Sequence, residues 1–317
     1  MAKILKIASY LPEDKITNEE LSNRFKNWSP EKIFLKTGIN KRSKSRENET
    51  SADLAILAAK KVFDNFEISK KEIDMLIFVT QTQNQCLPTS ACEIHNSLGL
   101  KTECGAFDIN QGCTGYIYGL FVANNLINNK SIKNILLLTG DTYTKLIDPY
   151  NASVSTLFGD GASATIIGQG EKSAIGEFEF GTDGSKSGLI KCDFAGFRKS
   201  TNKWKSLSMD GANVMSFTLS EVPKAIYSYL KNSGKELKDY DHIVFHQANK
   251  FILERLYKKL GISEKGLIHI ENCGNTVSSS IPLAMEGLTN QVNKNELNIL
   301  LVGFGVGLSW GITSVRI

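Results

Sequence analysis

The sequence predicts an α/β protein that is built from two similar halves. Apolar runs typical of buried strands alternate with segments whose apolar residues recur at three- and four-residue spacings, as on one face of a helix. Residues 72–79 resemble residues 239–245, and residues 135–140 resemble residues 299–303. Near-continuous apolar strands between helices are typical of sheets covered on both faces. We therefore expect a duplicated architecture in which each half runs strand, helix, strand, helix, strand.

The two halves are expected to divide near residues 168–173, giving an N-terminal half of residues 1–171 and a C-terminal half of residues 172–317. The chain starts with a segment typical of a first strand, residues 1–7, which lacks the apolar core of a signal peptide. Residues 194–210 are polar and are expected to form an excursion over the surface.

Composition indicates an ordinary globular protein. Of the 317 residues, 41% are hydrophobic and 22% are charged. The net charge of +4 is too small to indicate nucleic-acid binding but suits a modest basic patch for an acidic partner. No apolar stretch reaches the roughly 18 residues of a membrane span. Six cysteines form no Cys-x-x-Cys pair and no metal-ligand spacing, so we expect reduced thiols, a cytoplasmic location and no metal site.

Cys113 lies where a short strand gives way to a helix. The apolar residues after it recur at helical spacings: Ile117, Leu120, Phe121, Leu126 and Ile127. Gly112 and Gly115 flank the thiol and allow a tight turn. The start of a helix favours an anion, so we expect the pKa of Cys113 to fall from about 8.5 into the range of about 3.5–7.5. This setting indicates a nucleophile, and a small thiol buried under a helix is the alternative.

Two further segments supply groups that cooperate with a thiol. His246 ends an apolar, strand-like run, and Asn275 lies in a polar turn before another helix. Residues carried out of neighbouring strands in this way can meet above a sheet, giving a thiol, an imidazole and an amide. Each also has a structural alternative, because His246 can be a hydrogen-bonded core histidine and Asn275 can be the N-cap of the next helix.

Together these segments resemble the β-ketoacyl-acyl-carrier-protein synthase III family of thiolase-like condensing enzymes. The matching motifs are Gly-Cys-Thr-Gly at 112–115, His-Gln-Ala-Asn at 246–249 and Gly-Asn-Thr at 274–276, in the family's order. Other family landmarks stand at residues 35–39, 158–162, 181–185 and 304–311. The resemblance covers nearly the whole chain, and the combination of motifs is specific although no single one is.

The resemblance implies a duplicated thiolase-like fold, layered αβαβα with two back-to-back mixed sheets. It implies a transferase of lipid metabolism that moves an acyl group to Cys113 and then performs a decarboxylative Claisen condensation with malonyl-acyl carrier protein, in fatty acid or specialised acyl-chain biosynthesis. The backbone N–H groups of Cys113 and Val306 would form the oxyanion hole, while His246 and Asn275 would hold the malonyl thioester oxygen. Acyl-coenzyme A or acyl-carrier thioesters serve as substrates, with no metal or organic cofactor.

The resemblance also implies partners and substrate contacts. Acyl carrier protein is the expected partner, and a two-fold homodimer is expected in which the loop at residues 85–88 reaches into the partner's acyl tunnel. Leu87 stands where a larger aromatic residue is frequent, so a roomier tunnel end is expected. The expected substrate-binding residues are Trp28, Lys36, Leu87, Phe158, Leu207, Asn249 and Phe304.

The chain departs from the family where many members hold the adenine end of coenzyme A. Lys32, Lys36 and Ala152 replace a tryptophan and two arginines, and residues 250–252 lack the arginine that commonly follows His-Gln-Ala-Asn. Trp28, expected on the same helix face as Lys32, either takes over stacking or packs in the core. We predict weak use of acetyl-coenzyme A and a preference for carrier-bound or longer acyl thioesters, because a lysine does not reproduce stacking plus a bidentate arginine.

Two other activities are compatible with the same residue types. The scaffold can pass the acyl group to an amine or alcohol without decarboxylation, or the chain can be an unrelated Cys-His-Asn hydrolase of papain-like order. The duplication and the His-Gln-Ala-Asn context argue against the hydrolase. The glycine-rich segment at residues 303–307 lacks the GxGxxG spacing and the following helix of a dinucleotide site.

Overall fold

The structure is a computed structural model that describes residues 1–128, 131–170, 174–192, 206–292 and 296–317. The expected division of the halves near residues 168–173 falls partly outside the described residues, at 171–173, and so does most of the expected surface excursion, at 194–205. Within the described part of the chain, no helix is long and apolar enough to cross a membrane.

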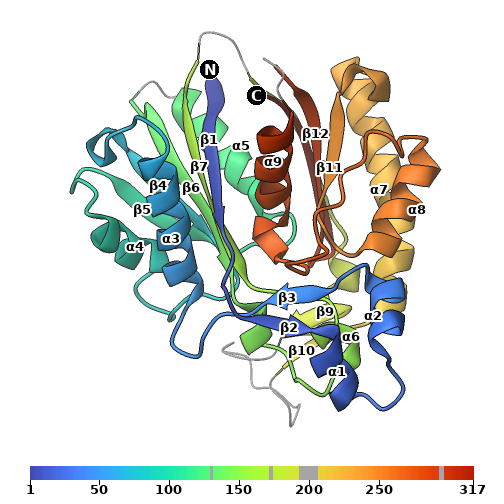
Figure 1. Ribbon diagram of the computed structural model, residues 1–317. Helices are drawn as coiled ribbons and strands as arrows, with labels where there is room; N and C mark the ends of the chain where they lie inside the picture. Colours follow the sequence, from blue (N-terminus) through green and yellow to red (C-terminus); the bar gives the residue numbers. More distant parts are fainter. Residues whose placement is uncertain (129–130, 171–173, 193–205, 293–295) are drawn as a thin grey trace.

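Helices and sheets alternate in five layers (Figure 1). The outer layer on the first sheet consists of α3 (Ser51–Asp64) and α4 (Ser90–Leu98). The central layer consists of α5 (Gly115–Asn128) and α9 (Ser280–Gln291), and the outer layer on the second sheet consists of α7 (Gly211–Ser233) and α8 (Lys250–Leu260). This arrangement confirms the predicted duplicated αβαβα fold.

The first sheet is mixed and has the order β1-β7-β6-β4-β5. Its strands are β1 (Ala2–Tyr10), β4 (Met75–Val79), β5 (Gly105–Ile109), β6 (Asn134–Asp141) and β7 (Gly161–Gln169). Strand β4 is parallel to β5 and β6, while β7 is antiparallel to β6 and β1. The first strand predicted from the N-terminal segment is therefore present, as an edge strand.

The second sheet repeats this topology with the order β11-β12-β13-β8. Its strands are β8 (Ile175–Thr182), β11 (His242–Phe245), β12 (Asn298–Gly305) and β13 (Ser309–Arg316). Strand β11 is parallel to β12, and β13 is antiparallel to its neighbours, as in the first sheet. Where the first sheet has its fifth strand, the second has only an isolated parallel bridge between Ile243 and Gly266.

Short elements gather at one end of the two sheets, at the bottom of Figure 1. They are β2 (Lys15–Thr17), α1 (Asn18–Arg24), α2 (Pro30–Thr37), β3 (Lys41–Ser43), α6 (Ala152–Ser155), β9 (Ile190–Cys192) and β10 (Leu207–Met209). Short 3₁₀ turns are η1 (Lys70–Glu72), η2 (Tyr143–Lys145), η3 (Gly184–Lys186), η4 (Leu237–Asp239) and η5 (Val277–Ser279). Strands β2 and β3 pair with each other, as do β9 and β10.

The start of α2 corrects one expectation about Trp28. The Ser29 side chain accepts a hydrogen bond from the backbone N–H of Lys32, and Pro30 occupies the first turn of the helix. This combination of an N-cap serine and an N1 proline starts the helix after Trp28. Trp28 therefore precedes the helix and does not share a helix face with Lys32.

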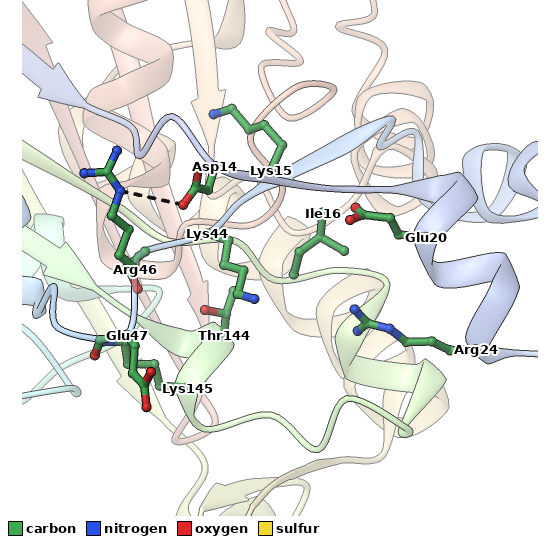
Figure 2. A pocket seen from close by; sticks show the side chains of 11 residues that line it. Asp14, Lys15, Ile16, Glu20, Arg24, Lys44, Arg46, Glu47, Thr144 and Lys145 are labelled. Carbon is green, nitrogen blue, oxygen red and sulfur yellow. Dashed lines mark hydrogen bonds and ion pairs between the residues drawn. The ribbon is translucent and has the colours of Figure 1, made fainter.

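A charged recess of about 710 Å³ lies beside α1, β2 and the loops that follow β3 and β6 (Figure 2). Side chains of both signs line it. Arg46 Nε lies 3.8 Å from Asp14 Oδ2, and Glu20 and Arg24 project from α1. Cys113, His246 and Asn275 do not line this recess, so it is separate from the site described below.

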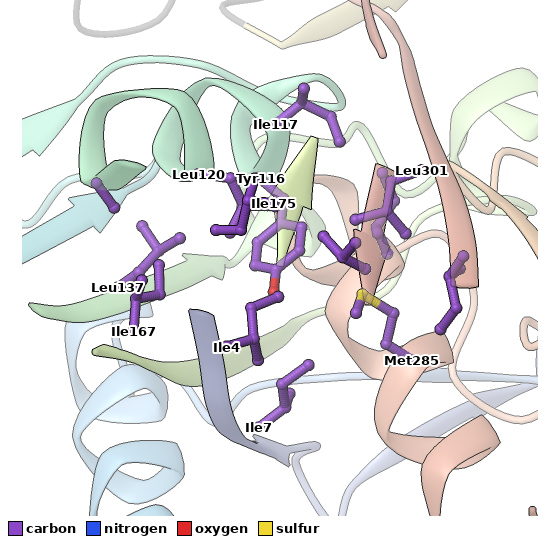
Figure 3. Packing of buried hydrophobic residues seen from close by; sticks show 14 of the residues in the cluster. Ile4, Ile7, Tyr116, Ile117, Leu120, Leu137, Ile167, Ile175, Met285 and Leu301 are labelled. Atoms are coloured by element: carbon purple, nitrogen blue, oxygen red, sulfur yellow. The ribbon is translucent and has the colours of Figure 1, made fainter. Parts of the chain in front are cut away.

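The central helices fix the two sheets relative to each other (Figure 3). Tyr116 and Leu120 of α5 and Met285 of α9 pack between Leu137 of the first sheet and Leu301 of the second, and all five side chains are fully buried. Burial of such side chains contributes about 1.5–3 kcal/mol each. The loops that leave the two sheets at the same end are therefore held in a fixed relation.

Candidate active site

Cys113 lies on the turn between β5 and α5, as the sequence predicts. The turn is closed by a hydrogen bond of 2.7 Å from the Gly115 N–H to the Gly112 carbonyl oxygen. A Cβ atom added at Gly112 would collide with the side chains of Gln81 and Val306. Glycine at this position therefore lets two other segments approach the thiol closely.

Strand β12 ends against the same thiol. Backbone hydrogen bonds from Val306 and from Cys113 itself reach the sulfur atom. Gly305 has a φ of +150°, and an added Cβ there would lie 2.8 Å from Cys113 Sγ. The two N–H groups that the resemblance assigns to the oxyanion hole therefore point at the position from which the sulfur would attack.

The acidity of the thiol differs from the expectation. Burial raises the pKa of Cys113 to about 12, and the nearby Asp141 carboxyl also acts to raise it, while the two backbone hydrogen bonds act to lower it. The predicted depressed pKa is wrong for this structure, because loss of solvation outweighs the helix start. At neutral pH the group is a thiol, so its attack on an acyl carbon needs a proton acceptor.

His246 directly follows β11 and is 2% exposed. Its Nδ1 lies 2.7 Å from Ser280 Oγ, and its ring meets the Phe304 ring edge-on with centroids 5.5 Å apart. Burial lowers the pKa of His246 to about 3. The imidazole is therefore neutral at pH 7, and Nε2 is the nitrogen that faces Asn275.

Asn275 is held by hydrogen bonds on both sides of its backbone. Its N–H donates to the Leu157 carbonyl oxygen at 2.9 Å, and its carbonyl oxygen accepts from Gly159 at 3.0 Å. The side-chain Oδ1 accepts from the Val277 N–H at 2.9 Å, so Nδ2 is directed to His246 Nε2 at 3.3 Å. Asn275 does not cap α9, which begins at Ser280, so the N-cap alternative is wrong.

The thiol, the imidazole and the amide line one cavity of about 470 Å³, which we call the thiol cavity. Of the predicted substrate-binding residues, Trp28, Lys36, Phe158, Asn249 and Phe304 line it too. Leu35 and Phe251 are exposed and also line it, which identifies the end that opens to solvent. The side-chain oxygen of Asn249 accepts from the Ile252 N–H at 2.9 Å and so also caps α8.

A second cavity of about 490 Å³, the side cavity, lies next to the first. Val306 and the predicted residue Leu207 line it, and Ile190 borders both cavities. Leu87 lines neither cavity and is 86% exposed. The structure thus places the predicted substrate-binding residues in two adjoining spaces and leaves Leu87 on the surface.

Comparison with known proteins gives the family. The profile of 3-oxoacyl-[acyl-carrier-protein] synthase III matches residues 107–184, and the profile of that family's C-terminal part matches residues 230–317. The chain belongs to the 3-oxoacyl-[acyl-carrier-protein] synthase III family. The β-ketoacyl-[acyl-carrier-protein] synthase III of Clostridium tetani is 34% identical over 99% of this chain and 98% of its own. The corresponding synthase III 1 of Vibrio vulnificus is also 34% identical, over 99% of each chain.

Solved structures of synthase III proteins share the fold over the whole chain. A 3-oxoacyl-(acyl-carrier-protein) synthase III known from a crystal structure is 41% identical, with a TM-score of 0.96 over 100% of this chain and 99% of its own. The synthase III of Aquifex aeolicus is 29% identical, with a TM-score of 0.91 over 100% of both chains. A priming β-ketosynthase of the R1128 polyketide pathway is 27% identical, with a TM-score of 0.93 over 100% of this chain and 96% of its own.

An aromatic ring that lines the thiol cavity is flanked by two lysines. The ammonium groups of Lys32 and Lys36 lie 5.7 Å and 5.3 Å from the centroid of the Trp28 ring. Trp28 is half-buried and lines the thiol cavity together with Ala152, so it is not a core residue. The enzyme thus presents a tryptophan and two flexible cations at this edge of the cavity.

Several residues near the thiol were not identified from the sequence. Ser280 orients His246, and buried Asp141 accepts hydrogen bonds from the Gln81 N–H and from Ser278 Oγ. The sequence indication for Asp141 is a charged residue at the end of an apolar strand. Ser280 follows two other serines in the sequence, and its only indication is a run of polar residues. Their partners come from distant segments, which spacing alone does not pair.

Proposed function

We propose that this protein is a decarboxylating β-ketoacyl synthase that loads an acyl group on Cys113 and extends it with a malonyl thioester. The observation that carries the proposal is that the Cys113 thiol, His246 and Asn275 line one cavity, while the backbone N–H groups of Val306 and Cys113 reach the sulfur atom. A nucleophile, an oxyanion hole and two side-chain donors are the groups that acyl transfer followed by enolate formation requires. The chemistry uses no metal and no organic cofactor.

Loading begins with the thiol proton. Neutral His246 accepts this proton at Nε2 while the sulfur attacks the carbonyl carbon of the acyl thioester. The developing oxyanion is stabilised by the N–H groups of Cys113 and Val306. The bond between the acyl carbon and the donor sulfur breaks, and the departing thiolate takes the proton from His246. A serine hydroxyl both donates and accepts, so Ser280 can bind His246 Nδ1 whether or not Nδ1 carries the proton. Both neutral tautomers are therefore supported, one with Nε2 as an acceptor and the other with Nε2 as a donor.

Condensation uses the other neutral tautomer of His246, in which Nε2 carries the proton and Nδ1 accepts from the Ser280 hydroxyl, so that His246 and Asn275 are both donors. The malonyl carboxylate leaves as carbon dioxide, and its electron pair remains as an enolate whose oxygen accepts from His246 Nε2 and Asn275 Nδ2. The enolate carbon attacks the acyl group on Cys113, and the carbon–sulfur bond breaks. The Cys113 thiolate then takes a proton from solvent water, which its raised pKa favours.

The test is incubation of the protein with an acyl donor and malonyl-acyl carrier protein labelled at the carboxyl group. Labelled carbon dioxide and a 3-oxoacyl product are expected. Transfer of the acyl group to an amine or alcohol without carbon dioxide would instead establish a simple acyltransferase, and release of free acid alone would indicate a hydrolase. Cys113→Ala is the control, because intact-mass spectrometry should show an acyl adduct on the native protein and none on this variant.

The donor is proposed to be a carrier-bound or longer acyl thioester, with acyl carrier protein as the partner of a cytoplasmic enzyme. The ammonium groups of Lys32 and Lys36 flank the Trp28 ring, but lysine gives a point charge without the planar, bidentate geometry of arginine. We expect a higher kcat/KM for acyl-carrier thioesters than for acetyl-coenzyme A. A preference for acetyl-coenzyme A that disappears in Trp28→Ala would contradict this.

The assembly is proposed to be a homodimer of this chain. Within the described residues β5 pairs only with β4, so one edge of the first sheet is open. Phe121 of α5 is 41% exposed and lies 5.3 Å, between ring centroids, from both Phe178 and Phe180 of β8. An open sheet edge and an exposed aromatic cluster are both features that a second copy would cover.

A further inference from the structure

The side cavity contains a polar group fixed next to the nucleophile. Gln81 follows β4, and its backbone N–H donates to Asp141 Oδ1 at 2.8 Å. Its side-chain Oε1 accepts a hydrogen bond of 2.6 Å from the hydroxyl of Tyr143, a 4% exposed residue. The same amide packs against Gly112, the residue before Cys113. Gln81 is therefore held at both ends beside the thiol.

These hydrogen bonds leave the amide nitrogen of Gln81 available. With Oε1 occupied by Tyr143, the two N–H groups of Nε2 are the free donors of the side chain, and they have no acceptor among the described residues. Gln81 and Tyr143 both line the side cavity, as does Val306, whose N–H bonds to the sulfur. An acyl group on Cys113 that enters this space passes a fixed hydrogen-bond donor.

Part of the lining suits the methylene groups of an acyl chain. Ile190 and Leu207 are nearly buried and supply apolar walls for methylene groups. The ammonium of Lys145, which also borders the cavity, already donates to the backbone carbonyl groups of Glu47 and Glu49. The amide of Gln81 is a neutral donor, which suits a hydroxyl or keto oxygen better than a carboxylate.

We propose that Gln81 is a specificity-determining residue that donates a hydrogen bond from Nε2 to an oxygen on the acyl chain, so that the preferred primer is a short hydroxyacyl or oxoacyl thioester. This inference rests on the proposed loading of Cys113. A plain saturated chain would leave the Nε2 donors without a partner in a partly desolvated space, which disfavours that chain relative to an oxygenated one.

The test is competitive loading of Cys113 from equal concentrations of carrier-bound thioesters, read by intact-mass spectrometry. The probes are butyryl, 2-hydroxybutyryl, 3-hydroxybutyryl, 3-oxobutyryl and succinyl thioesters. The native protein is expected to load at least one of the three neutral oxygenated groups about tenfold or more in preference to butyryl. Gln81→Leu is expected to abolish that preference, and Gln81→Glu, which keeps the shape but loses the donor, is expected to do the same.

Gln169→Leu is the matched control. Gln169 ends β7 and does not line the side cavity, and its Nε2 donates to the Ile132 carbonyl oxygen at 3.4 Å, so the preference ratio should persist in this variant. Equal loading of butyryl and all oxygenated groups, or a preference for succinyl, would overturn the inference while leaving the proposed synthase activity standing. Failure of every thioester to acylate Cys113 would overturn both.

Discussion

At Cys113, the reactivity of the thiol depends on the groups around it, which set its pKa and can accept its proton. Burial raises its pKa to about 12, while burial lowers the pKa of His246 to about 3, so a protonated sulfur faces a neutral imidazole at pH 7. In the proposed mechanism, proton transfer between the two is therefore part of the reaction rather than a property of the resting protein. This pairing assigns different roles to His246 and Asn275.

Asn275→Ala is expected to stop condensation while Cys113 still loads, because the amide acts on the malonyl oxygen. His246→Ala is expected to slow loading as well, since it removes the proton acceptor. Loss of one donor costs about 2.7–4 kcal/mol of barrier. Single-turnover acylation and carbon dioxide release should be measured separately on each variant. Equal loading rates in the two variants would show that His246 does not receive the thiol proton.

The depressed pKa of His246 also predicts how stability changes with pH. The unfolded chain binds a proton near pH 6.5, whereas the folded protein does so only near pH 3. The unfolded state thus holds more protons between these values, and stability is lost as the pH falls through this range. In His246→Gln, the free energy of unfolding should depend on pH less steeply, by about one proton.

Denaturant titrations at several pH values between 3 and 6.5 would measure this slope. Comparison of the two proteins isolates His246 from Asp141, whose pKa burial raises to about 7 and whose contribution has the opposite sign. An unchanged slope in the variant would mean that His246 titrates normally in the folded protein.

At the scale of elements, acylation of Cys113 is expected to depend on the end of β12 as much as on the turn that carries the thiol. Gly305→Ala would place a methyl group against Cys113 Sγ at a φ of +150°, so either the sulfur or the Val306 N–H must move. We expect acylation to slow by a factor on the order of 10²–10³, the usual cost of losing an oxyanion donor.

Gly184→Ala is the control for this substitution, because an added Cβ there meets nothing within 4 Å. Acylation rates should be compared after thermal melting has shown that both variants fold. A Gly305→Ala enzyme that loads at the native rate would refute the proposed place of β12 in the oxyanion hole.

The elements also show which parts of the site the sequence could predict. The strand before His246 and the turn before α5 have clear local patterns, and the structure places them where these patterns indicated. The start of α2 differs from the expectation, because Ser29 and Pro30 begin the helix after Trp28. The acidity of Cys113 also differs, because burial depends on the tertiary structure, which no local pattern contains.

At the scale of the whole molecule, the duplication was predictable from two pairs of similar segments, whereas the strand order of the two sheets was not. The absence of a fifth strand beside β11 was not predictable from the sequence. In the described residues its place is taken by an isolated bridge between Ile243 and Gly266. The pairing of Gln81 with Tyr143 was also not predictable, since the two residues lie on different loops and meet only when β4 and β6 are adjacent.

The proposed dimer should have a mass in solution of twice the 35.0 kDa of the chain. Leu87→Asp is expected to shift the protein towards monomers, because an 86% exposed leucine in the loop before α4 is a contact that a second copy would bury. Leu35→Asp, which changes a comparably exposed leucine on α2, should not. Multi-angle light scattering that finds a monomer of the native protein at micromolar concentration would exclude the dimer.

The duplication has a consequence for the point during translation at which the protein becomes active. The nucleophile comes from the first copy of the repeat, whereas its imidazole, its amide and one oxyanion donor come from the second, and Val306 lies close to the C-terminal end. A ribosome that stalls after the first copy therefore releases a polypeptide that has the thiol but none of these three groups. The ability to form a carbon–carbon bond then appears only when the last strands join the second sheet.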